Sequence, residues 1–265
     1  MKDQAAQLDP FSEEAIYRFY LAILRVLQRE LHLQRIHAEE LSREFSQTLR
    51  AKKEGAWPLI ASRLETTGIR CRWNQLLAHD RPSILASWIS PYCCGTVLDL
   101  LCGDGNLGEQ LALMGPKVVL TERMWSYNIT RTHAIPFIEF TDLMLHTPEA
   151  FDTVLICTVL HHEIEPAELL SLASRLGKAR LIIIENSLDK FGSEETQLLM
   201  DLFFARCLNS FSTPAIGQHR TISEWISMAN SYGVVRVEGK RYSLPGIPLS
   251  HDMIVVDLVN RPESH

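Results

Sequence analysis

The sequence predicts an α/β fold: a doubly wound, mostly parallel sheet of seven strands, preceded by a helical appendage. A buried-strand pattern over residues 97–101 runs into a glycine-containing turn and then into an amphipathic helix. From residue 97 onward strand and helix patterns alternate, which is typical of a parallel sheet covered on both faces. Earlier residues show helical periodicity only. We therefore expect an N-terminal helical appendage or cap over residues 1–79 and the sheet domain over residues 80–265.

Three amphipathic helices are expected in the appendage. Asp9-Pro10 is typical of a helix cap and first turn, and apolar residues then recur every three or four positions as far as Leu31. A second helix is expected over about 37–52, and a third begins at Trp57 and ends at Thr66-Thr67-Gly68. Amphipathic helices predict a buried face without identifying what covers it. Packing within the chain and homodimerisation are both open.

The elements of the sheet domain follow in order. A helix over 81–89 leads into it, and Pro91 separates that helix from the first strand. Strands are expected near 96–101, 117–121, 136–140, 152–157, 180–185, 233–238 and 252–258, and helices near 106–114, 125–132, 166–176, 194–209 and 222–232. Thr221 and Glu224 form a capping box at the start of the last helix. The loop before the final strand contains two prolines and no helical pattern, so this strand should run antiparallel to its neighbour.

The glycine turn after the first strand carries the first chemical signal. Gly103 and Gly105 permit backbone conformations that other residues resist, and the following helix start turns amide N–H groups toward a ligand. Asp99 could accept a hydrogen bond from a ligand's amine. Glu122 ends the second strand, 23 residues after Asp99, where an acid can bind both hydroxyls of a ribose. The two carboxylates indicate a nucleoside site.

Asp99-Leu100-Leu101-Cys102-Gly103-Asp104-Gly105 resembles the first motif of the class I S-adenosylmethionine-dependent methyltransferases, with Leu101 where that family usually has its first glycine. Glu122 matches the ribose acid of the family, and Asp142, after a third strand, matches the position that usually contacts the adenine amine. Residues 151–162 are similar to the fourth-strand segment of many small-molecule methyltransferases, including quinone-biosynthesis enzymes, which often ends in Leu-His-His. The resemblance covers about residues 80–259 and implies a Rossmann-like sheet.

The resemblance also implies S-adenosylmethionine as cofactor and S-adenosylhomocysteine as product. It places the cofactor against Asp99, Leu101, Gly103, Gly105, Asn106, Glu122, Arg123, Asp142, Leu143 and Thr158. Trp125 and Tyr127 could stack near the adenosine, although core packing is the alternative for at least one. Asp104 is expected to serve the N-terminus of the following helix.

Four histidines are candidates for the chemistry. His161 and His162 end the fourth strand and, if extended, face opposite ways, so only one should point into the pocket. His219 and His251 fall in loops near the ligand edge of the sheet. We predict that His162 and His219 are catalytic and that His161 and His251 bind substrate. The alternative for the pair at 161–162 is a structural role, in which they cap a strand and bond backbone groups.

Two carboxylates join the histidines as candidates. Glu163 and Glu185 are further possible bases. For Glu185, at the end of the fifth strand, a structural acceptor is the favoured interpretation.

Composition and charge exclude some classes of function. A net charge of −6 over 265 residues argues against a protein that mainly grips nucleic-acid phosphates. No apolar run reaches 18 residues and Met1-Lys2-Asp3-Gln4 opens no signal peptide, so we expect a cytoplasmic protein without a membrane span. The six cysteines form no CxxC pair, and we expect no metal site.

The leading hypothesis is a methyltransferase that moves a methyl group to an oxygen, nitrogen or carbon atom of a small organic acceptor by in-line displacement. The fourth segment lacks the Asn/Asp-Pro-Pro-aromatic and Pro-Cys sequences that resembled enzymes use on nucleic-acid bases, which argues against that acceptor. The alternatives are a methyltransferase for protein side chains, a non-catalytic nucleoside-binding module, and an NAD-dependent enzyme. The last is disfavoured because no second glycine turn follows.

Overall fold

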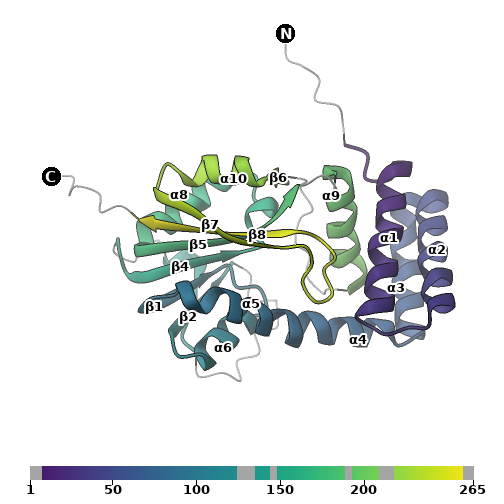
Figure 1. Ribbon diagram of the computed structural model, residues 1–265, viewed down its shortest axis with the longest axis horizontal. Coiled ribbons are helices and arrows are strands. Elements are labelled where there is room, and N and C mark those ends of the chain that lie inside the picture. Colours follow the sequence, from purple (N-terminus) through teal and green to yellow (C-terminus); the bar gives the residue numbers. More distant parts are fainter. Residues whose placement is uncertain (1–7, 124–134, 144–147, 189–192, 209–217, 259–265) are drawn as a thin grey trace, which may run out of the picture.

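The computed structural model describes residues 8–123, 135–143, 148–188, 193–208 and 218–258. A central sheet in the order β3-β2-β1-β4-β5-β8-β7, with β6 paired to β5, dominates these residues (Figure 1). The strands are β1 (Thr96–Leu100), β2 (Lys117–Glu122), β3 (Phe137–Glu139), β4 (Phe151–Cys157), β5 (Gly177–Leu188), β6 (Arg220–Thr221), β7 (Gly233–Arg241) and β8 (His251–Leu258). Among these strands, β8 pairs antiparallel with both of its neighbours, β5 and β7, and the other pairs are parallel. The predicted α/β sheet with a reversed last strand is confirmed, and the two-residue β6 is an addition.

Helices cover both faces of this sheet, with α8 and α10 on one and α5 and α6 on the other (Figure 1). The helices are α1 (Glu13–Arg29), α2 (Arg35–Lys52), α3 (Trp57–Thr66), α4 (Ile69–Gln75), α5 (Arg81–Ile89), α6 (Asn106–Leu113), α7 (Phe140–Leu143), α8 (Pro166–Leu176), α9 (Glu194–Phe203) and α10 (Ile222–Ala229). Alternate residues of each strand enter opposite cores: Leu98 packs on the α8 side and Val97 on the α5 side.

The N-terminal helices form a third core with α9, beside the sheet (Figure 1). Phe203 of α9 contacts Phe19 and Trp73, with ring centroids 5.4 Å apart in each pair. Trp73 also donates from Nε1 to the carbonyl of Gly246, in the loop between β7 and β8, at 2.9 Å. The appendage is therefore packed against elements that reach the carboxyl edge of the sheet.

Several predicted boundaries are corrected. The first helix begins at Glu13 rather than at Pro10, because Ser12 is the residue whose side chain caps it. The helix α4 was not predicted. The helix predicted over 194–209 is α9 followed by a π-helical turn over Phe204–Leu208, and the helix predicted over 222–232 ends at Ala229. The capping box of Thr221 and Glu224 is confirmed.

The expected helix over 125–132, with Trp125 and Tyr127, lies outside the described residues. None of the helices in the described ranges combines the length and the apolarity that crossing a bilayer requires.

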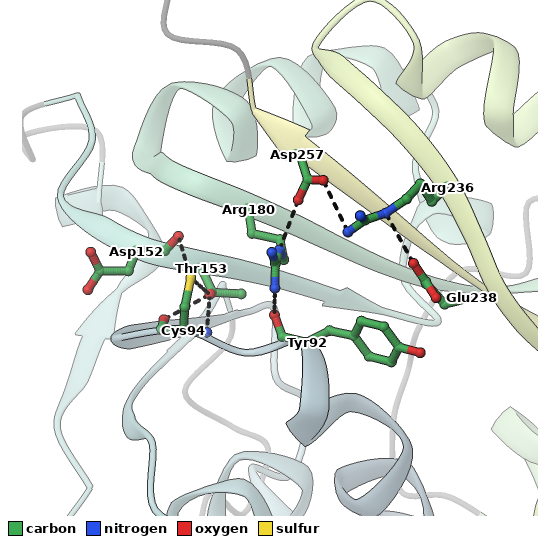
Figure 2. Close-up of polar contacts among 8 residues, drawn as sticks. All are labelled: Tyr92, Cys94, Asp152, Thr153, Arg180, Arg236, Glu238 and Asp257. Atoms are coloured by element: carbon green, nitrogen blue, oxygen red, sulfur yellow. Dashed lines mark hydrogen bonds and ion pairs between the residues drawn. The ribbon is translucent and has the colours of Figure 1, made fainter.

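The amino edge of the parallel strands is held by paired polar groups (Figure 2). Arg180 of β5 donates to the carbonyl of Tyr92 at 2.6 Å and to Asp257 of β8 at 3.1 Å. Asp257 also pairs with Arg236 at 3.0 Å. Thr153 of β4 accepts from the Cys94 amide at 3.0 Å. Because these groups satisfy one another, they stabilise this edge of the sheet.

Gly108 lets α6 pack closely against the sheet. A Cβ atom at this position would lie 2.3 Å from Cδ2 of Leu120 and 3.1 Å from Oδ2 of Asp99. We expect Gly108→Ala to lower the free energy of unfolding by about 1–3 kcal/mol through overpacking. Urea denaturation measures this change, with Gly55→Ala as control because a Cβ there approaches nothing closer than 3.9 Å. Equal midpoints for the two variants would contradict the packing.

Candidate functional site

The turn between β1 and α6 keeps a tight left-handed backbone despite its leucine. Leu101, Gly103 and Gly105 have φ values of +59°, +59° and +77°. A leucine pays about 1–2 kcal/mol for this conformation, but the side chain of Leu101 is buried in the core under α8, which offsets that cost. An added Cβ at Gly103 would meet nothing within 4 Å. The turn is therefore formed as the sequence predicts and has open space above Gly103.

Two carboxylates meet at this turn. Glu122 accepts hydrogen bonds from the Gly103 amide at 2.9 Å and from the Arg123 amide at 2.7 Å. Asp99 is 2% exposed, and its Oδ2 has no hydrogen-bond partner within the described part of the chain. Both acids thus lie on one side of the sheet, as a shared nucleoside site requires.

A third carboxylate, that of Asp104, adds to the negative charge at this turn. Burial, together with the negative charges of Asp104 and Glu122, raises the pKa of Asp99 to about 7. Burial also raises the pKa of Asp104 and of Glu122 above their ordinary values. Asp104 accepts from the amide of Asn106 at 3.1 Å, in the helix-start role predicted for it. Such a group of buried acids favours a ligand that carries positive charge.

Arg81, the first residue of α5, supplies a cation beside these acids. Its guanidinium donates to Oγ1 of Thr158 at 2.9 Å and acts electrostatically on Asp104 and on His161. Thr158 follows β4 and has a φ of +54°. Sequence reasoning missed Arg81 because it precedes every recognisable motif; only its place at the start of a helix leading into β1 could have indicated it.

A histidine cluster lies where β4 and β5 end, and Glu185 of β5 organises it. Glu185 accepts from the amides of Val159 and Leu160 at 2.8 and 2.7 Å, and its second oxygen lies 2.6 Å from Nδ1 of His161. Burial alone would lower the pKa of His161, but the Glu185 carboxylate outweighs it and raises the pKa. The preferred interpretation of Glu185 as a structural acceptor is confirmed.

The predicted geometry of His161 and His162 is wrong. The strand ends at Cys157, and Leu160–His162 form a 3-10 turn, so the two rings do not point to opposite faces. Their centroids are 3.9 Å apart. The strand ends where the predicted range of 152–157 ends, and beyond it Glu185 accepts from the amides of Val159 and Leu160.

The other two histidines join this cluster. His219 stacks on His161 with centroids 5.0 Å apart, and its Nε2 lies 2.9 Å from Oδ2 of Asp201 in α9. The pKa of Asp201 is lowered, because contact with His219 and nearby histidine charge outweigh its burial. His251 begins β8 rather than lying in a loop, and its burial lowers its pKa to about 3, so the ring is neutral. Asp201 was not predicted, since its helix showed only a packing pattern.

The remaining predicted cofactor residues lie around β2 and β3. The guanidinium of Arg123 pairs with Glu163 at 2.5 Å and lies over the ring of Phe140 at 4.6 Å. Asp142 is exposed at the end of the short helix α7, and Leu143 is buried. No described contact links these two residues to the glycine turn.

Comparison with solved structures identifies the fold. A chain of the complex between the Haloferax volcanii Trm112 methyltransferase activator and the "putative methyltransferase" matches with a TM-score of 0.51 and 11% identity, over 74% of this chain and 97% of that one. The YcgJ protein of Bacillus subtilis matches with a TM-score of 0.50 and 12% identity, over 67% of this chain and 99% of that one. No family model and no curated protein matches the sequence. At these identities the two matches show a shared fold, the Rossmann-like α/β sheet with its reversed strand.

Proposed function

We propose that the protein is an S-adenosylmethionine-dependent methyltransferase. The observation that carries the proposal is the hydrogen bond from the Gly103 amide to Glu122, with the buried carboxylate of Asp99 beside it. The residues fit the cofactor, because open space lies above Gly103 and the unpartnered Oδ2 of Asp99 can accept from an ammonium group. When bound, the cofactor supplies an activated methyl group on its sulfonium, whose charge suits the acidic pocket.

Individual residues have distinct roles in this proposal. Glu122 binds the ribose hydroxyls, Asp99 accepts from the ammonium group, and Asp142 contacts the adenine amine. Arg81 faces the carboxylate of the methionine portion, which a guanidinium can bind with two hydrogen bonds. The turn residues and their neighbours line the rest of the pocket; these are Leu101, Gly105, Asn106, Arg123, Leu143 and Thr158.

The acceptor is proposed to be a small organic molecule held against the histidine cluster. Arg81 acts on both Asp104 and His161, so the acidic pocket and the cluster share one edge of the sheet. His162 and His219 serve the removal of the acceptor's proton, and His161 and His251 line its binding site. His162 is half-buried, which leaves it the most accessible of the four rings. Because α9 carries Asp201 and packs on the N-terminal helices, those helices position this side of the site.

Thermal unfolding with three ligands tests the cofactor assignment. A ligand that binds only the folded state raises the apparent melting temperature by mass action. We expect S-adenosylmethionine and S-adenosylhomocysteine to raise it and NAD to leave it unchanged. A shift with NAD alone would overturn the proposal in favour of a dehydrogenase.

Transfer of a labelled methyl group separates enzyme from binding module. The protein is incubated with methyl-labelled cofactor and a cell extract divided into small molecules and macromolecules. We expect label in the small-molecule fraction. Label in protein would favour the side-chain methyltransferase, with the N-terminal helices as docking surface, and cofactor binding without any transfer would favour a non-catalytic module.

Cofactor affinity should depend on pH through Asp99. Because the pKa of this acid is raised to about 7 in the ligand-free protein, Asp99 is largely protonated at about pH 6 and largely ionised at about pH 8. The ammonium group of S-adenosylhomocysteine prefers the ionised form of Asp99, so this ligand should bind up to about tenfold more tightly at the higher pH. The same linkage makes the ligand-free protein lose stability as pH rises from about 4 to about 7, because over this range the folded protein keeps a proton on Asp99 that the unfolded chain has released. Calorimetric titration at the two pH values measures the effect, and an equal dependence in Asp99→Asn would contradict it.

A further inference from the structure

Three metal-ligand groups come together in the histidine cluster. His161, His162 and Asp201 each offer a ring nitrogen or a carboxylate oxygen, and these atoms all lie within 4.8 Å of one another. His161 and Asp201 are buried and His162 is half-buried. Two imidazoles and one carboxylate are a ligand set typical of zinc and related divalent transition metals, with further positions open to water or substrate.

The groups around these three residues have the arrangement that supports metal ligands. Nδ1 of His161 lies 2.6 Å from Glu185, so this nitrogen can donate its proton there and leave Nε2 as the ligand atom. His219 lies 2.9 Å from Oδ2 of Asp201 and can orient that carboxylate in the same way. Glu185 is itself fixed by two backbone amides. The cluster therefore has both ligands and the partners that orient them.

Unpartnered polar atoms point to a ligand at this place. Within the described residues, Nδ1 of His219 and Nε2 of His251 are buried without a hydrogen-bond partner, whereas Nε2 of His219 and Oδ2 of Asp201 lie 2.9 Å apart and partner each other. Buried polar atoms are rarely left in this state, because each costs about 1–3 kcal/mol. An ion with its bound water would give this group of atoms the partners that the chain does not provide.

We propose that His161, His162 and Asp201 bind one divalent transition-metal ion, with Zn²⁺ as the best-fitting probe, and that the half-buried side of His162 leaves a position open. The sequence did not indicate this site, because Asp201 lies about forty residues from the two histidines and no short spacing joins them. A second part of the inference rests on the proposed function. If the protein is a methyltransferase, the ion selects acceptors whose reacting group is a hydroxyl or carboxylate oxygen that it can bind. In that case His162 contributes to removal of the acceptor's proton by binding the ion, and His219 contributes by orienting the carboxylate of Asp201.

Metal binding is tested on the full chain after treatment with a chelator. Co²⁺ is titrated and followed by its visible absorption, and Zn²⁺ affinity is measured by competition with a chromogenic chelator. We expect one ion per chain. His162→Ala should lower the Zn²⁺ affinity by at least about tenfold, and Glu185→Gln by about 10–100-fold. His37→Ala is the matched control, since His37 is exposed on α2, and should bind as the unaltered protein does.

The outcomes separate this inference from the proposed function. Absence of Co²⁺ absorption, or equal Zn²⁺ affinity in His162→Ala and His37→Ala, would overturn the metal site whatever the cofactor does. The melting shift with S-adenosylhomocysteine is recorded on the same samples. If S-adenosylhomocysteine raises the melting temperature but no metal binds, the metal site alone is refuted. If one ion binds but S-adenosylhomocysteine does not raise the melting temperature, the methyltransferase proposal alone is refuted. Circular dichroism of each variant establishes that it is folded, and His162→Gln replaces His162→Ala if the latter is not.

Discussion

Replacing Gly103 with leucine should abolish cofactor binding while leaving the fold intact. The space above Gly103 is open, so the new side chain meets no protein atom at its Cβ and instead occupies the region where the ligand is proposed to lie. Leu101 shows that this turn accommodates a leucine at a φ of +59°, the same value as at Gly103. We expect affinity for S-adenosylhomocysteine to fall by at least about 100-fold, or about 2.7 kcal/mol.

Gly68→Leu provides the matched control for that variant. Gly68 lies between α3 and α4, has a φ of +69°, and likewise has nothing within 4 Å of an added Cβ. Both substitutions carry a backbone cost of about 1–2 kcal/mol, so their melting temperatures should fall by similar amounts. If the Gly103 variant bound the ligand as tightly as the Gly68 variant, the pocket would have to lie elsewhere.

Glu185→Ala should cause the largest loss of stability at the site. The change removes the acceptor of two backbone amides and of the buried His161 ring. Removing one partner of a buried, hydrogen-bonded pair typically costs about 3–5 kcal/mol. Urea unfolding measures this change. Glu185→Gln keeps one acceptor oxygen and should lose less.

Glu168→Ala is the control for that experiment, because Glu168 is exposed in the first turn of α8. Surface changes of this kind usually alter the free energy of unfolding by no more than about 0.5 kcal/mol. A Glu185→Ala variant as stable as Glu168→Ala would mean that Glu185 does not organise the cluster.

The sheet was predictable because its information is local. Most of the central strands are short apolar runs, and Pro245, Gly246 and Pro248 exclude a crossover helix before β8, so even the reversed strand follows from the sequence. The glycine turn was predictable for the same reason, since Asp99, Gly103 and Glu122 lie within one strand-helix-strand unit. Leu101 did not disturb it, because burial of its side chain offsets the strained backbone.

The histidine cluster was only partly predictable because its geometry depends on distant partners. The sequence singled out His161, His162, His219 and His251, but it did not predict the 3-10 turn over Leu160–His162 or the hydrogen bonds that Glu185 accepts from the backbone there. Asp201 and Arg81 belong to helices whose patterns report packing, and only the tertiary fold turns them toward the site. The role of the appendage was open for the same reason, since the partner of its apolar face, α9, lies more than 100 residues away in the sequence.

The most direct test of the central claim is calorimetric titration of S-adenosylhomocysteine into the unaltered protein and into Glu122→Ala. The side chain of Glu122 is half-buried and accepts a hydrogen bond from the Gly103 amide, so the Glu122→Ala variant should still fold. The account predicts one ligand per chain for the unaltered protein and no measurable binding for the variant. Equal binding by both proteins, or no binding by the unaltered one, would contradict a methyl-donor site between Asp99 and Glu122.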